Sequence, residues 1–170
     1  MHKTGHVGAA LLVYSPIGLL LLIAGLNELA VLGGVSMVAL ATLPDCDHRL
    51  PIVEHRGPTH SLTFAAALGA VLGAVGFALG EQLTALSSVT MGSFAFLIGV
   101  LAVLSHLAAD SITPMGIRPF WPISEWHYSA NVVRAKNPIA NYLLLAVGLA
   151  ATTGVLFLAA ELARTAPEQP

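Results

Sequence analysis

His106 and Asp110 end an otherwise uncharged run, and their residue types and spacing could support chemistry. Four residues apart on a helix, the two side chains would lie on one face, about one turn from each other. The pair alone could equally form a structural hydrogen bond between helices. Ionisable groups within an apolar span are costly, however, and usually face a cavity or mark a functional site.

Three further groups of polar residues flank apolar runs. Asp45 and Asp47, in the stretch PDCDH, directly follow one run, whereas His55 and His60 precede the next. His6 lies at the start of the first run. Imidazole and carboxylate groups are ligands of borderline divalent metals such as Zn²⁺, and Mn²⁺ or Fe²⁺ also accept this set. We therefore expect a divalent-metal site, with Zn²⁺ as the favoured ion.

The candidate metal ligands outnumber the three or four that one catalytic zinc ion needs. They are His6, Asp45, Asp47, His55, His60, His106 and Asp110. This surplus predicts one to three ions, or one ion with additional residues behind its ligands. Two-metal sites suit phosphoester hydrolysis, in which Asp45 or Asp47 would orient or deprotonate the attacking water. Arg56 or Arg118 could bind a phosphate through two hydrogen bonds.

Composition indicates which elements position these residues. Hydrophobic residues make up 56% of the chain and charged residues only 9%, whereas about 25% is typical of soluble proteins. A spanning helix needs about 20 mostly apolar residues. We expect an all-α polytopic membrane helix bundle, a single integral-membrane domain over residues 1–170. Its predicted spans are 7–26, 29–43, 61–80, 89–109 and 139–162. The second is the shortest and could stop before the far interface.

Five spans would place the N-terminus and two polar segments, residues 44–60 and 111–138, on one side of the membrane. Most basic residues fall on that side, and only Arg164 lies opposite. The positive-inside rule therefore predicts that the N-terminus and the site are cytoplasmic and the C-terminus is outside. All seven histidines also fall on or near this side, which supports a single polar site. Asn137 and Pro138 are typical of a helix start.

The segment 111–138 combines aromatic and basic residues, Trp121 and Arg118 among them. It could form an aromatic belt at the headgroups, a lid over the metal site, or both. The net charge is −2 and no basic tract is present, so we expect no nucleic-acid partner. The expected partners are the lipid bilayer and a lipid or phosphoester substrate. The oligomeric state is left open.

Four stretches carry a family resemblance in the same order along the chain: an N-terminal histidine, PDCDH, HRGPTHS and SHLAADSITPMGIRPFWPIS. Over roughly residues 1–130 the sequence resembles the YdjM-type membrane-bound metal-dependent hydrolases, a family regarded as distantly similar to zinc-dependent phospholipases C and single-strand nucleases. The resemblance implies a helical membrane protein whose divalent-metal site uses the seven candidate ligands, with Arg56 and Thr59 beside them. Cys46 departs from the family pattern, in which an aliphatic residue is common.

Three functions are compatible with these features. A hydrolase would act on a phosphoester of a lipid or amphiphile through a metal-activated water. A transport protein for a metal ion or protons could use the same histidines and aspartates, but transporters usually bind near the membrane midplane. A non-catalytic membrane scaffold would leave the polar residues unexplained. Because the candidate ligands lie at one face, we expect the hydrolase.

Overall fold

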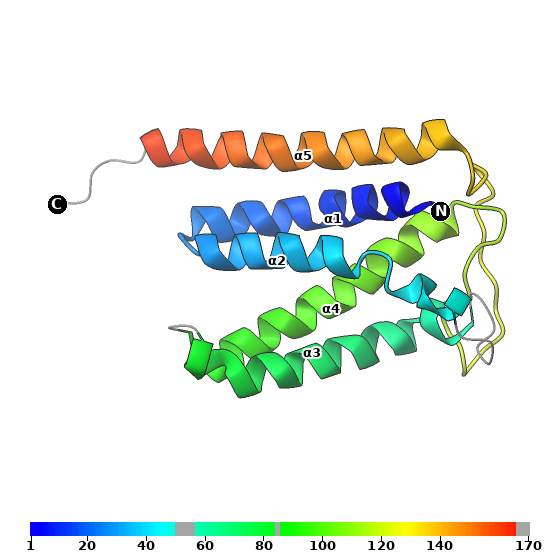
Figure 1. Cartoon of the computed structure of the whole chain (residues 1–170), viewed down its shortest axis with the longest axis horizontal. Coiled ribbons are helices and arrows are strands. Elements are labelled where there is room, and N and C mark those ends of the chain that lie inside the picture. Colours follow the sequence, from blue (N-terminus) through cyan, green and yellow to red (C-terminus); the bar gives the residue numbers. More distant parts are fainter. Residues whose placement is uncertain (50–56, 84–85, 166–170) are drawn as a thin grey trace.

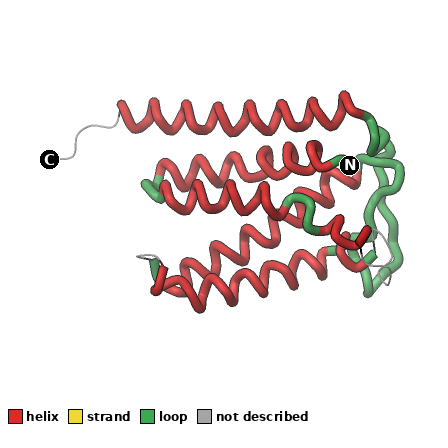
Figure 2. The backbone as a smooth tube through the Cα atoms, in the orientation of Figure 1, coloured by secondary structure: helices red, strands yellow, loops and turns green. Residues whose placement is uncertain are grey.

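The computed structural model describes residues 1–49, 57–83 and 86–165. Its five long helices are α1 (Lys3–Ile23), α2 (Asn27–Leu40), α3 (Leu62–Leu83), α4 (Ser88–Ser111) and α5 (Pro138–Thr165) (Figure 1). Two short 3-10 helices, η1 (Pro44–Arg49) and η2 (Pro58–His60), lie between α2 and α3. Over the described ranges the chain is helix and loop, without a named strand (Figure 2). The predicted all-α class is confirmed.

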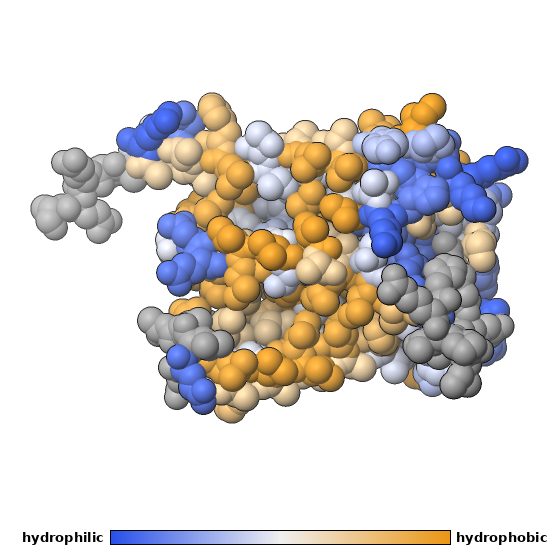
Figure 3. Space-filling model, viewed as in Figure 1, coloured by the Kyte–Doolittle hydropathy of each residue, from blue (hydrophilic) through white to orange (hydrophobic). Residues whose placement is uncertain are grey.

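All five helical segments are long and apolar enough to cross a membrane, although the second qualifies only as Asn27–Asp47, which includes part of η1. Apolar side chains cover the middle of the bundle surface, and hydrophilic side chains gather towards its two ends (Figure 3). Val71 on α3, for example, is 60% exposed. An apolar surface of this extent suits lipid rather than water. The chain is a multi-pass membrane protein.

The ends of two helices depend on capping side chains. Ser87 accepts a hydrogen bond from the backbone N–H of Thr90 at 3.2 Å and begins α4. At the start of α5, Asn137 accepts one from the backbone N–H of Ala140 at 3.3 Å, so the predicted start at Pro138 is confirmed. α4 runs to Ser111, two residues beyond the predicted span, and therefore holds both His106 and Asp110 in helical geometry.

Close packing around α1 organises one half of the bundle. α1 packs along α5 and also contacts α2 and α4, whereas α3 packs along α4. A Cβ atom at Gly8 would overlap the backbone of Leu144, and one at Gly148 would overlap the backbone of Gly8. These glycines let the backbones of α1 and α5 touch, as small residues do in membrane bundles. The start of α1 is thereby fixed beside the start of α5.

The long connection between α4 and α5 covers one end of the bundle (Figure 1). Its two arms meet at a single antiparallel bridge between Ile117 and Tyr128. The backbone N–H of Ala130 donates to Ser111 at 2.8 Å, and that of Leu62, at the start of α3, donates to Pro119 at 2.8 Å. The connection is therefore attached to two helix ends, at the same end of the bundle as the start of α1.

Candidate metal centre

Three helical elements bring histidines and aspartates together at this end of the bundle. His6 lies in the first turns of α1, Asp45 in η1, and His106 and Asp110 near the end of α4; one ligand atom from each lies within 4.8 Å of the others. His60, the last residue of η2, joins them, because its Nε2 is 3.1 Å from Nε2 of His106. The first four form a group able to bind a metal ion, and with His60 the five residues are here named the His/Asp cluster.

The spacing within the cluster matches what a small cation requires. Nε2 of His60 lies 3.6 Å from Asp45 and 3.5 Å from Asp110, and Nε2 of His106 lies 3.5 Å and 3.6 Å from the same carboxylates. These separations are at or beyond the limit of a hydrogen bond. Two ligand atoms each about 2.0–2.1 Å from a tetrahedral Zn²⁺ would lie about 3.3 Å apart. The donor set and its spacing therefore fit such an ion.

A backbone carbonyl fixes the orientation of His106. Its Nδ1 lies 2.8 Å from the carbonyl oxygen of Ala41, at the end of α2. Because a carbonyl only accepts hydrogen bonds, Nδ1 carries a proton that it donates to Ala41, and Nε2 faces the cluster. The ring of His6 stacks on that of His106, with centroids 3.7 Å apart and planes at 5°. Two parallel rings thus form one wall of the cluster.

His60 is held from behind by a side-chain relay. The Thr59 hydroxyl donates to Oδ2 of Asp47 at 2.9 Å and lies 3.0 Å from Nδ1 of His60. Since that hydroxyl proton is used by Asp47, Thr59 accepts from Nδ1–H, which leaves Nε2 facing the cluster. Burial alone would lower the pKa of His60, but the carboxylates of Asp110 and Asp45 outweigh burial and raise the pKa above its ordinary value. The surroundings of His60 thus favour positive charge.

Burial distinguishes the cluster from an ordinary group of interfacial polar residues. The side chains of His6, His60, His106 and Asp110 are fully buried, and only Asp45, 24% exposed, opens to the surroundings. Neither ring nitrogen of His6 has a hydrogen-bond partner within the described part of the chain. Its Nε2 lies 3.7 Å from both carboxylates. Buried polar atoms normally have partners, so the His6 ring is an exception in this part of the chain. The ammonium group of Met1 also pairs with Asp110.

Four of the six other predicted site residues lie in the described part of the chain, outside the cluster. Asp47 and Thr59 are buried on the Nδ1 side of His60, not at its Nε2. Arg118 pairs with Glu125 at 3.3 Å, and the carbonyl of Trp121 accepts a hydrogen bond from the Thr63 hydroxyl at 2.9 Å. His55 and Arg56 lie outside the described residues. The Ala41 carbonyl could not be predicted as a partner of His106, because every residue carries a backbone acceptor.

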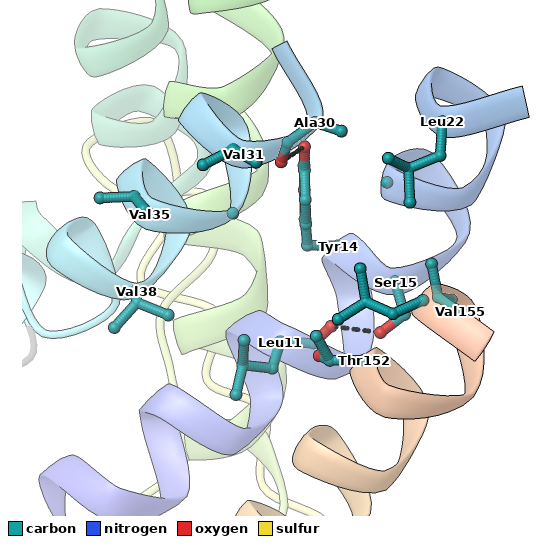
Figure 4. A pocket seen from close by; sticks show the side chains of 13 residues that line it. Leu11, Tyr14, Ser15, Leu22, Ala30, Val31, Val35, Val38, Thr152 and Val155 are labelled. Atoms are coloured by element: carbon teal, nitrogen blue, oxygen red, sulfur yellow. Dashed lines mark hydrogen bonds between the residues drawn. The ribbon is translucent and has the colours of Figure 1, made fainter. Parts of the chain in front are cut away.

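A cavity of about 410 Å³ lies elsewhere, between α1, α2 and α5 (Figure 4). Its lining is almost wholly apolar and shares no residue with the cluster. The hydroxyls of Tyr14, Ser15 and Thr152 donate to backbone carbonyls at 2.7, 2.8 and 3.0 Å. These donors are already used within the helices. The cavity therefore offers no polar group comparable to those of the cluster.

Fold and cluster together define a multi-pass membrane protein with a candidate metal centre at one end of its helices. The model of the family described as YdjM inner membrane protein matches residues 1–166, so the chain belongs to this family. The match confirms the resemblance found in the sequence and extends it through α5. Comparison with curated proteins gives no match, and comparison with solved structures gives none.

Proposed function

We propose that the chain is a membrane-bound, metal-dependent hydrolase that acts on a phosphoester of a lipid or another amphiphile. One observation carries the metal-dependent part: the buried His6 ring has no hydrogen-bond partner in the described chain, and its Nε2 faces two carboxylates at 3.7 Å. A cation between them would give the His6 ring a partner. Hydrolysis is the chemistry that such nitrogen and oxygen ligand sets support in water.

The residues that would hold the ion are the five of the His/Asp cluster. Neutral imidazoles and carboxylates favour Zn²⁺, with Mn²⁺ or Fe²⁺ as alternatives. When bound, a divalent ion supplies a water of lowered pKa and stabilises negative charge on a phosphate oxygen. The carboxylates of Asp45 and Asp110 place negative charge beside the imidazoles. Buried carboxylates favour a cationic partner, which supports metal binding here.

The two aspartates of η1 take different roles in this proposal. Asp45 lies at the open side of the cluster, and we assign to it the orientation of the attacking water and the removal of its proton. Asp47 acts through Thr59, by holding the ring of His60 in place. Arg118, with Arg56, is proposed to bind the phosphate, and Trp121 to contact the substrate beside it.

The proposed location is the cell membrane, with the cluster at the cytoplasmic face. The helix order places Lys3, Arg118, Arg134 and Lys136 at the end of the bundle that holds the cluster, whereas Arg164 follows near the other end of α5. Basic residues are enriched in short cytoplasmic segments of membrane proteins. This asymmetry supports the orientation.

Metal analysis combined with an activity assay tests the function. Wild type, His106→Ala and the control His127→Ala would be purified in detergent, and the metal content measured by mass spectrometry. His127 makes its hydrogen bond to the carbonyl of Met115 at 2.8 Å, away from the cluster, and matches His106 in residue type. Release of phosphate or phosphorylated headgroup would then be followed on phospholipid and lysophospholipid vesicles.

We expect wild type and His127→Ala to contain a divalent metal and to hydrolyse at least one phosphoester, and His106→Ala to lose most of both. Equal metal content in the two variants would contradict the metal centre. Metal bound by wild type without hydrolysis of any lipid or soluble phosphoester would keep the metal centre and contradict the hydrolase.

A further inference from the structure

Residues 116–128, here named the aromatic hairpin, expose large apolar side chains outside the helices. Ile123 is 90% exposed and Trp126 is 52% exposed. The rings of Phe120 and Trp126 have centroids 5.7 Å apart, and those of Trp126 and Tyr128 5.8 Å. Three aromatic rings thus form a row on one side of the hairpin. Exposed apolar groups gathered in this way mark an interaction surface.

The contacts of the hairpin fix its depth relative to the bundle. The backbone N–H of Leu62, the first residue of α3, donates to the carbonyl of Pro119 at 2.8 Å. The hydroxyl of Thr63 donates to the carbonyl of Trp121 at 2.9 Å. Both residues belong to the first turn of a candidate membrane span. The hairpin is therefore level with the start of the candidate span of α3.

The backbone of the hairpin is suited to a region with little water. Six of its N–H groups donate within the hairpin, namely those of Ile117, Trp121, Ile123, Ser124, Trp126 and Tyr128. Pro119 and Pro122 have no N–H to satisfy. A segment whose donors are largely satisfied avoids much of the penalty for leaving bulk water.

Charged groups keep the hairpin from inserting deeply. Arg118 and Glu125 form an ion pair at 3.3 Å across it, and the Glu125 side chain is well exposed. A segment that carries exposed aromatic rings beside an ion pair fits the boundary between headgroups and acyl chains, where Trp and Tyr are enriched. Neither bulk water nor the hydrocarbon centre suits both kinds of group.

We propose that the aromatic hairpin inserts its aromatic row and Ile123 into the headgroup region of the bilayer, beside the start of α3. The occupant of this surface is phospholipid at the membrane interface. Insertion does not depend on a metal ion or on hydrolysis, so this proposal and the proposed function can fail separately.

The two tryptophans of the chain, Trp121 and Trp126, provide the test, because both lie in the hairpin. Trp121→Phe leaves Trp126 as the sole fluorophore. The full-length variant would be reconstituted into phosphatidylcholine vesicles with bromine near the glycerol end or near the tail of the acyl chains. The depth control is Val71→Trp on a background without either native tryptophan. Position 71 lies nine residues along α3 from Leu62, about 14 Å deeper at 1.5 Å per residue.

We expect bromine near the glycerol to quench Trp126 at least twofold more strongly than bromine near the tail, and the reverse order for Val71→Trp. Iodide in the buffer should quench Trp126 weakly. Strong quenching by iodide without quenching by brominated lipid would place the hairpin in water and overturn the proposal. Quenching by neither would mean that protein, such as a second copy of the chain, covers the surface, and would overturn it too. Trp126→Phe, which keeps Trp121, is a second probe if the first variant does not fold.

Discussion

Replacing the Thr59 hydroxyl tests how the protein orients a metal ligand without touching the ligand itself. Thr59→Val keeps the shape of the buried side chain and removes the atom that joins Asp47 to His60. The variant leaves all five residues of the His/Asp cluster unchanged. Any loss of metal affinity then reports on the orientation of His60.

The expected magnitude follows from the two hydrogen bonds lost. The hydroxyl donates to the Asp47 carboxylate at 2.9 Å and lies 3.0 Å from Nδ1 of His60. Removing a partner behind a metal-ligating histidine typically weakens metal binding about 10–100-fold. We expect a loss of this size, which corresponds to about 1.4–2.7 kcal/mol of binding free energy. Thr59→Ser, which retains the hydroxyl, should stay within about threefold of wild type.

The assay is competition for Zn²⁺ between the purified protein and a fluorescent chelator of known affinity. Wild type, Thr59→Val, Thr59→Ser and His60→Ala would be compared in one detergent, after gel filtration has shown that each is monodisperse. His60→Ala sets the loss expected when the ligand itself is removed. We expect Thr59→Val to fall between Thr59→Ser and His60→Ala.

Two results would refute this reasoning. If Thr59→Val bound Zn²⁺ as tightly as Thr59→Ser, the hydroxyl would not orient His60. If His60→Ala also bound as tightly as wild type, His60 would not be a ligand, and the relay behind it would serve only the packing of η2.

Three further predictions concern packing, metal and transport. Gly8→Leu should destabilise the bundle by about 1–3 kcal/mol or more in a detergent unfolding titration, because the new side chain would meet the α5 backbone. The control Gly154→Leu, with open space around it, should change the stability little. Removing metal with a chelator should lower the midpoint of thermal unfolding, and adding metal back should restore it. Free metal at about 100 times its dissociation constant stabilises the folded state by about 2.7 kcal/mol. An unchanged midpoint would argue against a bound ion. Proteoliposomes should show metal-ion flux no greater than protein-free vesicles, and flux abolished by His106→Ala would instead favour a transporter.

The sequence predicted most of the helical framework because each helix carries a long uncharged run. The beginnings and ends differ by a few residues: α1 begins at Lys3 rather than at residue 7, since polar Lys3 and His6 can enter a first turn. α2 ends at Leu40, and the 3-10 helix η1 follows from Pro44. Pro44 explains the change, because proline removes a backbone donor. The number of spans was predicted from hydropathy, and shifts of a few residues at helix ends do not alter that number.

Less of the candidate site could be predicted. Histidines and aspartates occur at several predicted helix ends on one side of the membrane. This predicted that His6, His106 and Asp110 would meet, and the structure brings them together. The separate places of Asp45 and Asp47 could not be predicted, because in the 3-10 geometry of η1 residues two positions apart face different neighbours. Asp45 faces the cluster and Asp47 faces Thr59. Only the folded chain shows this difference.

The position of the cluster favours an enzyme over a transporter on physical grounds. A transporter needs a binding site that can open to both sides of the membrane, usually near the midplane. Between the cluster and the far ends of the spans, the runs 7–27, 29–44, 61–80, 82–105 and 137–160 contain no Asp, Glu, Lys, Arg or His. The hydroxyls of Tyr14 and Ser15 donate to backbone carbonyls, so they do not extend a polar path. A buried cluster whose one partly exposed residue, Asp45, lies at one face can meet a substrate there and return the product to the same side.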